Sequence, residues 1–557
     1  MGEWSWAHAD MISAIGLNRC RHYLRIAGVF TVFAVATIVL YLHAPVEGDF
    51  VWSDAPRHAL NGIFVHDFLA HLPMADPRGF AVRYYLQYPA LTVLFYPPLF
   101  SGALALAYAV FGFSHPVAQG TVAVFYLLLG CLYYGLARRW VGGLLALAAG
   151  LLLVGAPEIT FWGRQVMLDI PTYAWLVATV IVFVRYLDQE RPRDLYSSVL
   201  LLAFALYTKQ TPLFVIPAMA LGLWAGQGRR VLGNRHVWGA TLLALVLIAP
   251  LIFLQLKFGQ VNSASLLGGS QRADMSRLSL AAWTYYASVL PAQLGWPTVV
   301  LALIYIGGCC VRPAWRLPRA HMVLLLAWLV CGYLFFSFIM VREPRHDLMA
   351  LLPLPLFAVL AIQHLASVRY AYGGQASAVL LAVGLLAWSI AYRPIQFVRG
   401  YEQAAAYVLE HAPADSVVLF SGNRDGSFIF NMRAGKRGDV SVARADKLLF
   451  RVSIERERGI QDRQLTGERI SEFFHQHGVR YIVYDPDFWQ DLPSMAALSA
   501  LLEDHRRFAL VQEIRTTANF NQADKRLRIY QFLGELQSPA LPLGAELVGI
   551  GTELKAN

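Results

Sequence analysis

The first 391 residues alternate long apolar runs with short polar loops. A helix that crosses a membrane needs roughly 20 apolar residues. The apolar runs lie at 26–42, 91–112, 117–137, 143–157, 171–187, 195–208, 212–226, 236–256, 283–311, 320–340, 347–365 and 375–391. This pattern predicts a polytopic α-helical membrane domain at residues 1–391, with about 11 to 13 transmembrane helices and a first external loop at 45–88. Short helices along the membrane surface are expected within that loop.

Beyond residue 391 the pattern is that of a soluble domain. Strands are expected at 416–421, 480–484, 508–516 and 526–533, and helices at 402–411, 466–477 and 493–507. Their alternation predicts a C-terminal soluble α/β domain at residues 392–557. Its loops contain no glycine-rich phosphate-binding motif, which favours a structural or acceptor-binding role over catalysis.

The composition supports this division. Hydrophobic residues make up 57% of the chain and charged residues 15%, and the mean hydropathy is +0.47. Soluble domains carry roughly 25% charged residues, so a wholly soluble protein is excluded. The net charge of +10 arises mainly from arginines in short loops. The positive-inside rule produces that distribution, so we expect a lipid bilayer and no nucleic acid as partner. The cysteines have no metal-site spacing.

Basic residues also orient the chain. The arginine-rich loops at 138–139, 229–230 and 312–319 should face the cytoplasm. The basic segment before the run 26–42 predicts an uncleaved first helix with a cytoplasmic N-terminus. An odd number of crossings then places the loop 45–88 and the C-terminal domain on the external or periplasmic side of the inner (plasma) membrane.

Ionisable residues next to membrane-embedded helices are energetically costly and therefore mark candidate functional sites. Several fall in the loops predicted to be external. They are Asp49, Asp54, Arg57 and His58 after the first run, Arg164 and Asp169, Lys209, and Arg345 and His346. Tyr96, in a Tyr-Pro-Pro-Leu segment, is a weaker candidate.

Each candidate also has a structural explanation. Asp54 and Asp169 both lie close before a proline, where a carboxylate caps a helix. Lys209 could extend from a short turn to the membrane surface, and the loop 342–347 could be internally paired. Lysine and arginine also bind phosphate. Two carboxylates, a lysine and a basic loop on one face therefore suggest a site for a phosphorylated, membrane-borne substrate.

Two other functions are open on these observations. A transporter or flippase would place charges near the middle of the membrane and often has repeated halves, of which the sequence shows no sign. A non-catalytic envelope scaffold would leave the candidates without a common purpose. The test is spatial: Asp54, Asp169, Lys209 and Arg345 should share one site in an enzyme, and lie apart otherwise.

The order of the motifs resembles the GT-C superfamily of lipid-linked-sugar glycosyltransferases. After the first helix come an acidic residue, Tyr-Pro-Pro-Leu, Arg-x-x-x-x-Asp-Ile-Pro, Thr-Lys and then Arg-His. The chain is most similar to the protein O-mannosyltransferase and lipid A aminoarabinose transferase group, glycosyltransferase family 39, over about residues 20–390. The family often has Asp-Glu where this chain has Asp54-Ala55, and Lys-Pro-Pro where it has Tyr96-Pro97-Pro98.

The resemblance implies an activity and residue roles. Asp54 would be the catalytic residue, with Asp49 as the fallback, and Asp169 would be the second-loop aspartate. Residues that hold the donor phosphate would be Lys209, Arg345 and His346, and further substrate contacts would come from Arg57, His58, Tyr96 and Arg164.

The implied reaction moves a monosaccharide from a polyprenyl-phosphate donor to a hydroxyl group, with inversion. Asp54 would act as the general base. The acceptor would be an envelope glycolipid such as lipid A, a polysaccharide, or a protein. Nothing in the sequence requires a cofactor, although a divalent metal ion is compatible with it.

Overall fold

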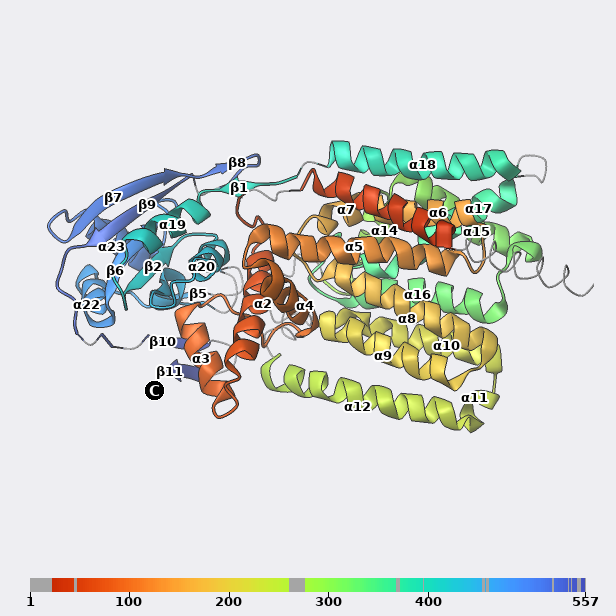
Figure 1. Cartoon of the computed structure of the whole chain (residues 1–557), viewed down its shortest axis with the longest axis horizontal. Coiled ribbons are helices and arrows are strands. Elements are labelled where there is room, and N and C mark those ends of the chain that lie inside the picture. Colours follow the sequence, from red (N-terminus) through yellow and green to blue (C-terminus); the bar gives the residue numbers. More distant parts are fainter. Residues whose placement is uncertain are drawn as a thin grey trace, which may run out of the picture.

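The computed structural model describes residues 23–44, 48–259, 276–366, 371–393, 395–452, 456, 460–522, 525–538, 540–541, 543–547 and 552–555. The molecule is elongated, with a bundle of helices at one end and an α/β domain at the other (Figure 1). Three helices from the segment that follows the first apolar helix lie between these parts.

The bundle is built from helices that follow the predicted apolar runs. They are Tyr23–Tyr41, α5 (His115–Ala137), α6 (Gly143–Val154), α7 (Pro157–Gly163), α8 (Asp169–Gln189), α9 (Pro192–Thr208), η1 (Thr211–Phe214), α10 (Val215–Gln227), α11 (Arg230–Gly233), α12 (Arg235–Phe258), α14 (Leu280–Leu294), α15 (Trp296–Val311), η2 (Pro313–Trp315), α16 (Arg319–Phe338), η3 (Leu348–Ala350), α17 (Pro353–Leu365) and α18 (Ala371–Tyr392). Helices α8 and α17 are buried inside the bundle, whereas α12 exposes apolar side chains such as Leu242 and Phe253.

Among the described residues, seven helices are long and apolar enough to cross a membrane, or up to nine if each of two bent pairs is one span. The multi-pass prediction is therefore confirmed, with fewer full-length spans than the sequence count. Several apolar runs form shorter helices, such as Thr211–Gln227. The run 283–311 is not one helix, because the chain bends by 119° between α14 and α15. Gly295, with φ +83°, occupies that bend.

Helices α2 (Asp54–His71), α3 (Pro77–Gln87) and α4 (Leu99–Phe111) connect the bundle to the C-terminal domain. Helix α2 packs on α4 and on α20 (Asp425–Ala434) of that domain. The helix expected within residues 54–72 of the loop 45–88 is α2, and α3 is a further helix beyond that segment.

The C-terminal domain is centred on a five-stranded sheet of order β3-β2-β6-β9-β7. Its strands are β2 (Val417–Ser421), β3 (Ser441–Arg444), β6 (Val479–Tyr484), β7 (Phe508–Arg515) and β9 (Arg526–Phe532). The strands β3, β2 and β6 are parallel, and β9 and β7 are antiparallel. Smaller pairs are β1 (Val398–Arg399) with β8 (Thr517–Ala518), β4 (Phe450–Val452) with β5 (Ile460–Asp462), and β10 (Gly544–Leu547) with β11 (Thr552–Lys555).

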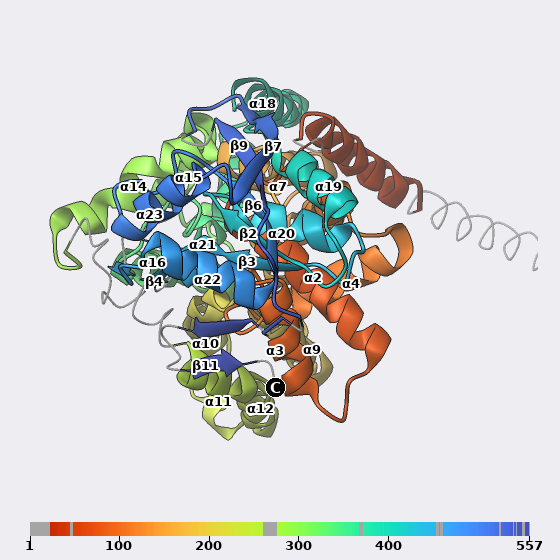
Figure 2. The same cartoon turned by 90° about the vertical axis from the view of Figure 1, so that its left-hand side faces the viewer.

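Helices cover both faces of the sheet, which confirms the predicted α/β fold (Figure 2). They are α19 (Tyr401–His411), α20, α21 (Ala445–Leu448), α22 (Gly467–His477) and α23 (Pro493–Leu502). Side chains of α19 and α20 pack on Val418 and Val483 of the sheet, and α22 and α23 pack on the opposite face. The face with α20 is turned toward α2 and α3, and its core is continuous with theirs.

Candidate functional site

Five segments far apart in sequence meet at the end of the bundle that faces the C-terminal domain. They are the first turn of α2, the loop before α4, the first turn of α8, the turn after α9 and the loop that ends at residue 347. These segments carry Asp54, Tyr96, Asp169, Lys209 and Arg345. We call Asp54, Asp169, Lys209 and Arg345 the central cluster.

Asp54 is the first residue of α2 and its side chain is one-third exposed, at 33%. Its Oδ2 atom lies 4.0 Å from Nη2 of Arg345. It also forms a side-chain hydrogen bond with Tyr96, whose pKa is raised by burial and by this carboxylate. Ser53, the residue that precedes α2, makes no side-chain cap.

Buried Asp169 and partly buried Lys209 form an ion pair. Lys209 Nζ lies 2.7 Å from Asp169 Oδ1, and the Tyr173 hydroxyl donates to the same oxygen at 3.4 Å. Lys209 follows the last residue of α9 in an extended conformation, which turns it back toward α8. The lysine is therefore paired within the protein, which differs from the alternative in which it reaches the membrane surface.

Arg345 interacts electrostatically with Asp54 and Asp169, the two carboxylates of the central cluster. Its Nε atom lies 2.8 Å from Glu343 Oε2, and its guanidinium covers the ring of Trp162 at 4.7 Å. Burial alone would lower the pKa of Arg345, but the neighbouring carboxylates of Asp169, Glu343 and Asp54 raise it. The arginine is a permanent cation between the two acids of the central cluster.

Two histidines of the site are neutral at physiological pH. Burial lowers the pKa of His58, one turn along α2 from Asp54, to about 4. Its ring packs edge-on against Tyr96, with centroids 4.5 Å apart. Burial and the charges of Arg345 and Lys209 lower the pKa of His346 to about 4. Either imidazole ring can therefore donate or accept a hydrogen bond without carrying a positive charge.

Three other candidates make contacts that lead away from the central cluster. Asp49, at 2% exposure, accepts bonds from Tyr401 N, Glu402 N and Asn431 Nδ2 at 2.9, 3.3 and 2.7 Å. This carboxylate thus holds the first turn of α19. Arg57 pairs with Asp425 of α20 at 3.1 Å.

Arg164 is buried and donates to backbone carbonyls. Its partners are Thr160 O at 3.0 Å, His43 O at 3.4 Å and Arg393 O at 3.3 Å. These bonds tie α7 to the ends of the Tyr23–Tyr41 helix and of α18. The geometry gives Arg164 a role in holding the bundle together.

Sequence reasoning missed residues that shape the site. Gln293 donates to Pro344 O and Asp347 Oδ1, both at 2.5 Å, and so fixes the loop that carries Arg345. A single polar amide inside the apolar run 283–311 could have marked Gln293 as a candidate from the sequence. Trp162 and Tyr173 lie in apolar stretches where aromatic residues are ordinary, so their sequence carried no such signal.

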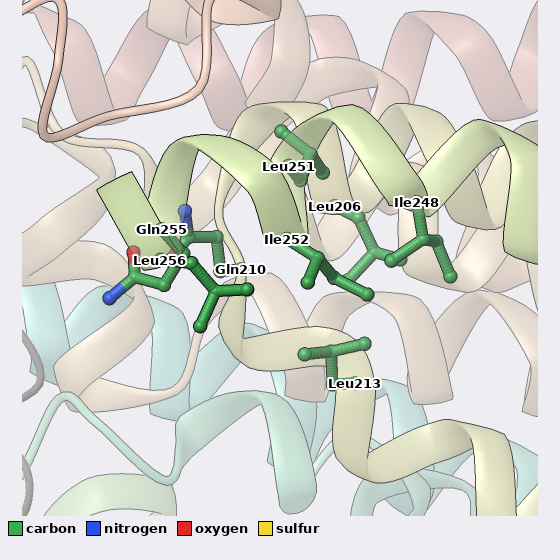
Figure 3. A pocket seen from close by; sticks show the side chains of 8 residues that line it. All are labelled: Leu206, Gln210, Leu213, Ile248, Leu251, Ile252, Gln255 and Leu256. Carbon is green, nitrogen blue, oxygen red and sulfur yellow. The ribbon is translucent and has the colours of Figure 1, made fainter. Parts of the chain in front are cut away.

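An apolar cavity of about 150 Å³ lies between the end of α9 and α12 (Figure 3). It is lined by Leu206, Gln210, Leu213, Ile248, Leu251, Ile252, Gln255 and Leu256. Gln210 directly follows Lys209 in the chain.

No three His, Cys, Asp or Glu side chains come together as a metal site in the part of the chain that the structure describes. In the central cluster Asp169 pairs with Lys209 at 2.7 Å, whereas Asp54 lies 4.0 Å from Arg345.

Comparisons with known proteins agree with this architecture. Residues 96–253 match the protein family described as dolichyl-phosphate-mannose-protein mannosyltransferase. This segment contains Tyr96, Asp169 and Lys209. A search of curated protein sequences finds no match.

Solved structures match over nearly the whole chain. The structure of ArnT from Cupriavidus metallidurans bound to undecaprenyl phosphate has a TM-score of 0.59 and 17% identity, covering 92% of this chain and 99% of that one. The Archaeoglobus fulgidus oligosaccharyltransferase in complex with Zn and sulfate has a TM-score of 0.52 and 12% identity, covering 82% and 68%.

Fold and family segment together define the class: the protein is a multi-pass GT-C glycosyltransferase, of the class that takes its sugar from a lipid phosphate. More particularly, residues 96–253 form a domain similar to the dolichyl-phosphate-mannose-protein mannosyltransferases, within a chain that has the fold of ArnT. The resemblance read from the sequence is confirmed.

Proposed function

We propose that this glycosyltransferase moves a monosaccharide from a polyprenyl phosphate to an acceptor hydroxyl with inversion, using Asp54 as the general base. The observation that carries the proposal is the convergence of the central cluster. Asp54 lies 4.0 Å from Arg345, Lys209 lies 2.7 Å from Asp169, and the charges of Asp169 and Arg345 influence each other. A scaffold has no need to gather two acids and two cations from four segments.

Asp54 would remove the proton from the acceptor hydroxyl as its oxygen attacks the anomeric carbon. The bond from that carbon to the phosphate oxygen breaks, and its electron pair leaves with the polyprenyl phosphate. The attack comes from the face opposite the phosphate, so the configuration inverts. The partial exposure of Asp54 suits a group that must reach an incoming substrate.

The leaving phosphate needs charge stabilisation more than protonation. Lys209 and Arg345 would supply it, because preorganised cations stabilise charge that develops in the transition state. Asp169 would orient Lys209, and the neutral His346 could donate a hydrogen bond. The apolar cavity between the end of α9 and α12 has an aliphatic lining that suits part of a polyprenyl chain (Figure 3). The ArnT structure bound to undecaprenyl phosphate supports this donor class.

The proposed topology puts the N-terminus in the cytoplasm and the C-terminal domain outside the inner membrane. It follows from the basic loops at 138–139 and 229–230. The site then opens to the side where envelope acceptors lie, namely a glycolipid such as lipid A, a polysaccharide or a protein. The reaction as proposed requires no divalent ion.

The test is release of polyprenyl phosphate by purified protein in lipid, from a panel of polyprenyl-phosphate sugars with crude envelope acceptor. Wild type should act on one sugar class, and Asp54→Asn should lower kcat by about 10²–10⁴-fold, the usual contribution of a general base. A chelator should leave the rate unchanged. Undiminished transfer by Asp54→Asn would exclude the base assignment. If no donor releases polyprenyl phosphate, the result would favour a transporter or flippase of lipid-linked substrates.

A further inference from the structure

The C-terminal domain holds the segment that leads into Asp54 by its backbone. Ser427 Oγ donates to Phe50 O at 3.1 Å, and Arg424 donates to Val51 O. Arg57 donates to Ser53 O at 3.3 Å. The carbonyls of Phe50, Val51 and Ser53 thus each accept a bond, two of them directly from the loop and helix that follow β2.

Arg57 links this segment to a buried set of charges. Besides Ser53, it donates to both oxygens of Asp425 at 3.3 and 3.1 Å. Arg444 Nη1 lies 2.7 Å from Asp425 Oδ2, and Arg444 pairs with both oxygens of Asp446 at 2.9 and 2.6 Å. We call Arg57, Asp425, Arg444 and Asp446 the interface network. Their side chains are only 10–18% exposed.

The network also reaches the loop of Tyr96. Arg444 donates to Pro89 O at 3.1 Å, at the start of that loop. Asp425 begins α20 directly after β2, and Arg444 ends the neighbouring parallel strand β3. The carboxyl edge of the sheet is therefore fastened to both segments that position the Asp54 and Tyr96 pair.

We propose that Arg57, Asp425 and Arg444 are positioning residues for the transfer reaction, through which the C-terminal domain fixes the first turn of α2 and hence the carboxylate of Asp54. The proposal rests on the proposed function. It assigns Arg57 to positioning in place of the substrate contact that the resemblance implied.

The physical reason is that Asp54 has little to hold it directly. Its partners are Arg345 at 4.0 Å and the Tyr96 hydroxyl. Its direction is therefore set mainly by the backbone of the first turn, which the interface network holds one turn away. A displacement of about 1 Å at a reacting group can cost about 100-fold in rate.

The chain offers a matched control. Asp67 of α2 and Arg433 of α20 form a second buried ion pair between the same two helices, with Nη2 and Nε at 2.5 and 3.1 Å from Asp67 Oδ2. Tyr84 donates to that oxygen at 2.8 Å. Asp67 is 13 residues beyond Asp54, about 20 Å along the helix. This pair docks the domain without holding the first turn.

The experiment compares Arg57→Met and Asp425→Asn with Asp67→Asn and Arg433→Met in the full-length protein in lipid. The first two should lower kcat by about 10–100-fold with donor KM within about twofold, because ground-state binding is kept. The kcat of the double variant should be no lower than that of either single variant, because both substitutions break the same Arg57–Asp425 contact. The control pair should keep kcat within about twofold at a similar loss of thermal stability.

Arg57→Lys separates the two bonds of the arginine. Lysine keeps a charge toward Asp425 but lacks the planar fork that reaches Asp425 and Ser53 O together. Thermal stability should return to that of the wild type while kcat recovers only in part. Full recovery of kcat would overturn the bridging role.

Equal losses of kcat in both pairs would show that the network only docks the domain, and no loss in the first pair would also overturn the proposal. Hydrogen–deuterium exchange of residues 49–60 provides a readout that needs no donor. Faster exchange in Arg57→Met and Asp425→Asn alone supports positioning even if the wild type transfers nothing. In that case the proposed function fails by itself. Equal exchange in both pairs rejects positioning.

Discussion

Two clusters of buried charge flank the first turn of α2, and they differ in how fully their members are paired. In the interface network, Arg444 meets Asp425 and Asp446 at 2.6–2.9 Å, and Arg57 meets Asp425 from the other side. In the central cluster, Asp54 has its nearest cation at 4.0 Å. Charges that saturate one another hold structure, whereas charges with spare bonding capacity are arranged to receive a ligand.

The same contrast separates two aspartates that are five positions apart in the sequence. Asp49 accepts three N–H donors from the C-terminal domain and is closed to solvent. Asp54 is one-third exposed and faces Arg345. Both were sequence candidates for the catalytic aspartate. Their surroundings make Asp54 the better placed of the two and give Asp49 a structural task.

The largest expected effect on stability comes from breaking the interface network. Arg444→Met leaves Asp425 and Asp446 buried without their shared cation. Removing one partner of a buried pair costs about 3–5 kcal/mol. Denaturant unfolding in detergent should show that loss. The control is Arg83→Met, which breaks an exposed pair with Asp76 at 58% and 59% exposure and should cost at most about 1 kcal/mol. Equal losses would mean that the network is not a closed structural unit.

Lys209→Gln should affect activity strongly and stability less than Arg444→Met does. Removing its charge from the leaving phosphate should lower kcat/KM about 100-fold, which is about 2.7 kcal/mol of transition-state stabilisation. Stability should fall less than in Arg444→Met, because Asp169 keeps the Tyr173 hydroxyl and the charge of Arg345.

Steady-state kinetics with the donor would measure the change, with Lys209→Arg as the charge-preserving control. A variant that kept its kcat/KM but unfolded as readily as Arg444→Met would place Lys209 with the structural charges. The central cluster would then lose its distinction from the interface network.

The sequence predicted what depends on local pattern. Long apolar runs located the bundle helices, and short apolar runs located strands such as β2 and β6. The candidates Asp54, Asp169, Lys209 and Arg345 do meet in space, as a shared site required. Three of them stand at or directly beside a helix end, namely Asp54 at the start of α2, Asp169 at the start of α8 and Lys209 just after α9, whereas Arg345 lies in the loop between α16 and η3.

The sequence could not predict contacts between residues that are far apart in the chain. Arg57 and Asp425 are separated by 368 positions, and nothing local to either names the other. Arg164 bonds to carbonyls, which have no side-chain signature. The run 283–311 kept its hydrophobicity through the bend at Gly295, so length and composition alone suggested one helix. Substrate contacts were therefore assigned to residues whose bonds lie within the protein.

The smallest of these effects distinguishes the two clusters by pH. Burial lowers the pKa of His58, beside the central cluster, to about 4 from its ordinary 6.5. As the pH falls below 6.5, the unfolded chain takes up a proton that the folded protein refuses until about pH 4. Stability is thus complete above pH 6.5 and is lost on acidification, by about 2 kcal/mol at pH 5. The arginines of the interface network do not titrate in this range.

His58→Phe keeps a ring against Tyr96 but cannot take up the proton. Its unfolding free energy should therefore fall less than that of the wild type between pH 7 and pH 5, by about the same 2 kcal/mol. His505→Phe, at an exposed position, controls for the loss of a histidine as such. An unchanged slope in His58→Phe would mean that the ring takes up its proton near pH 6.5 in the folded protein as well as in the unfolded chain. The positive charge beside Asp54 would then be larger than the neutral ring implies, and the difference between the two clusters correspondingly smaller.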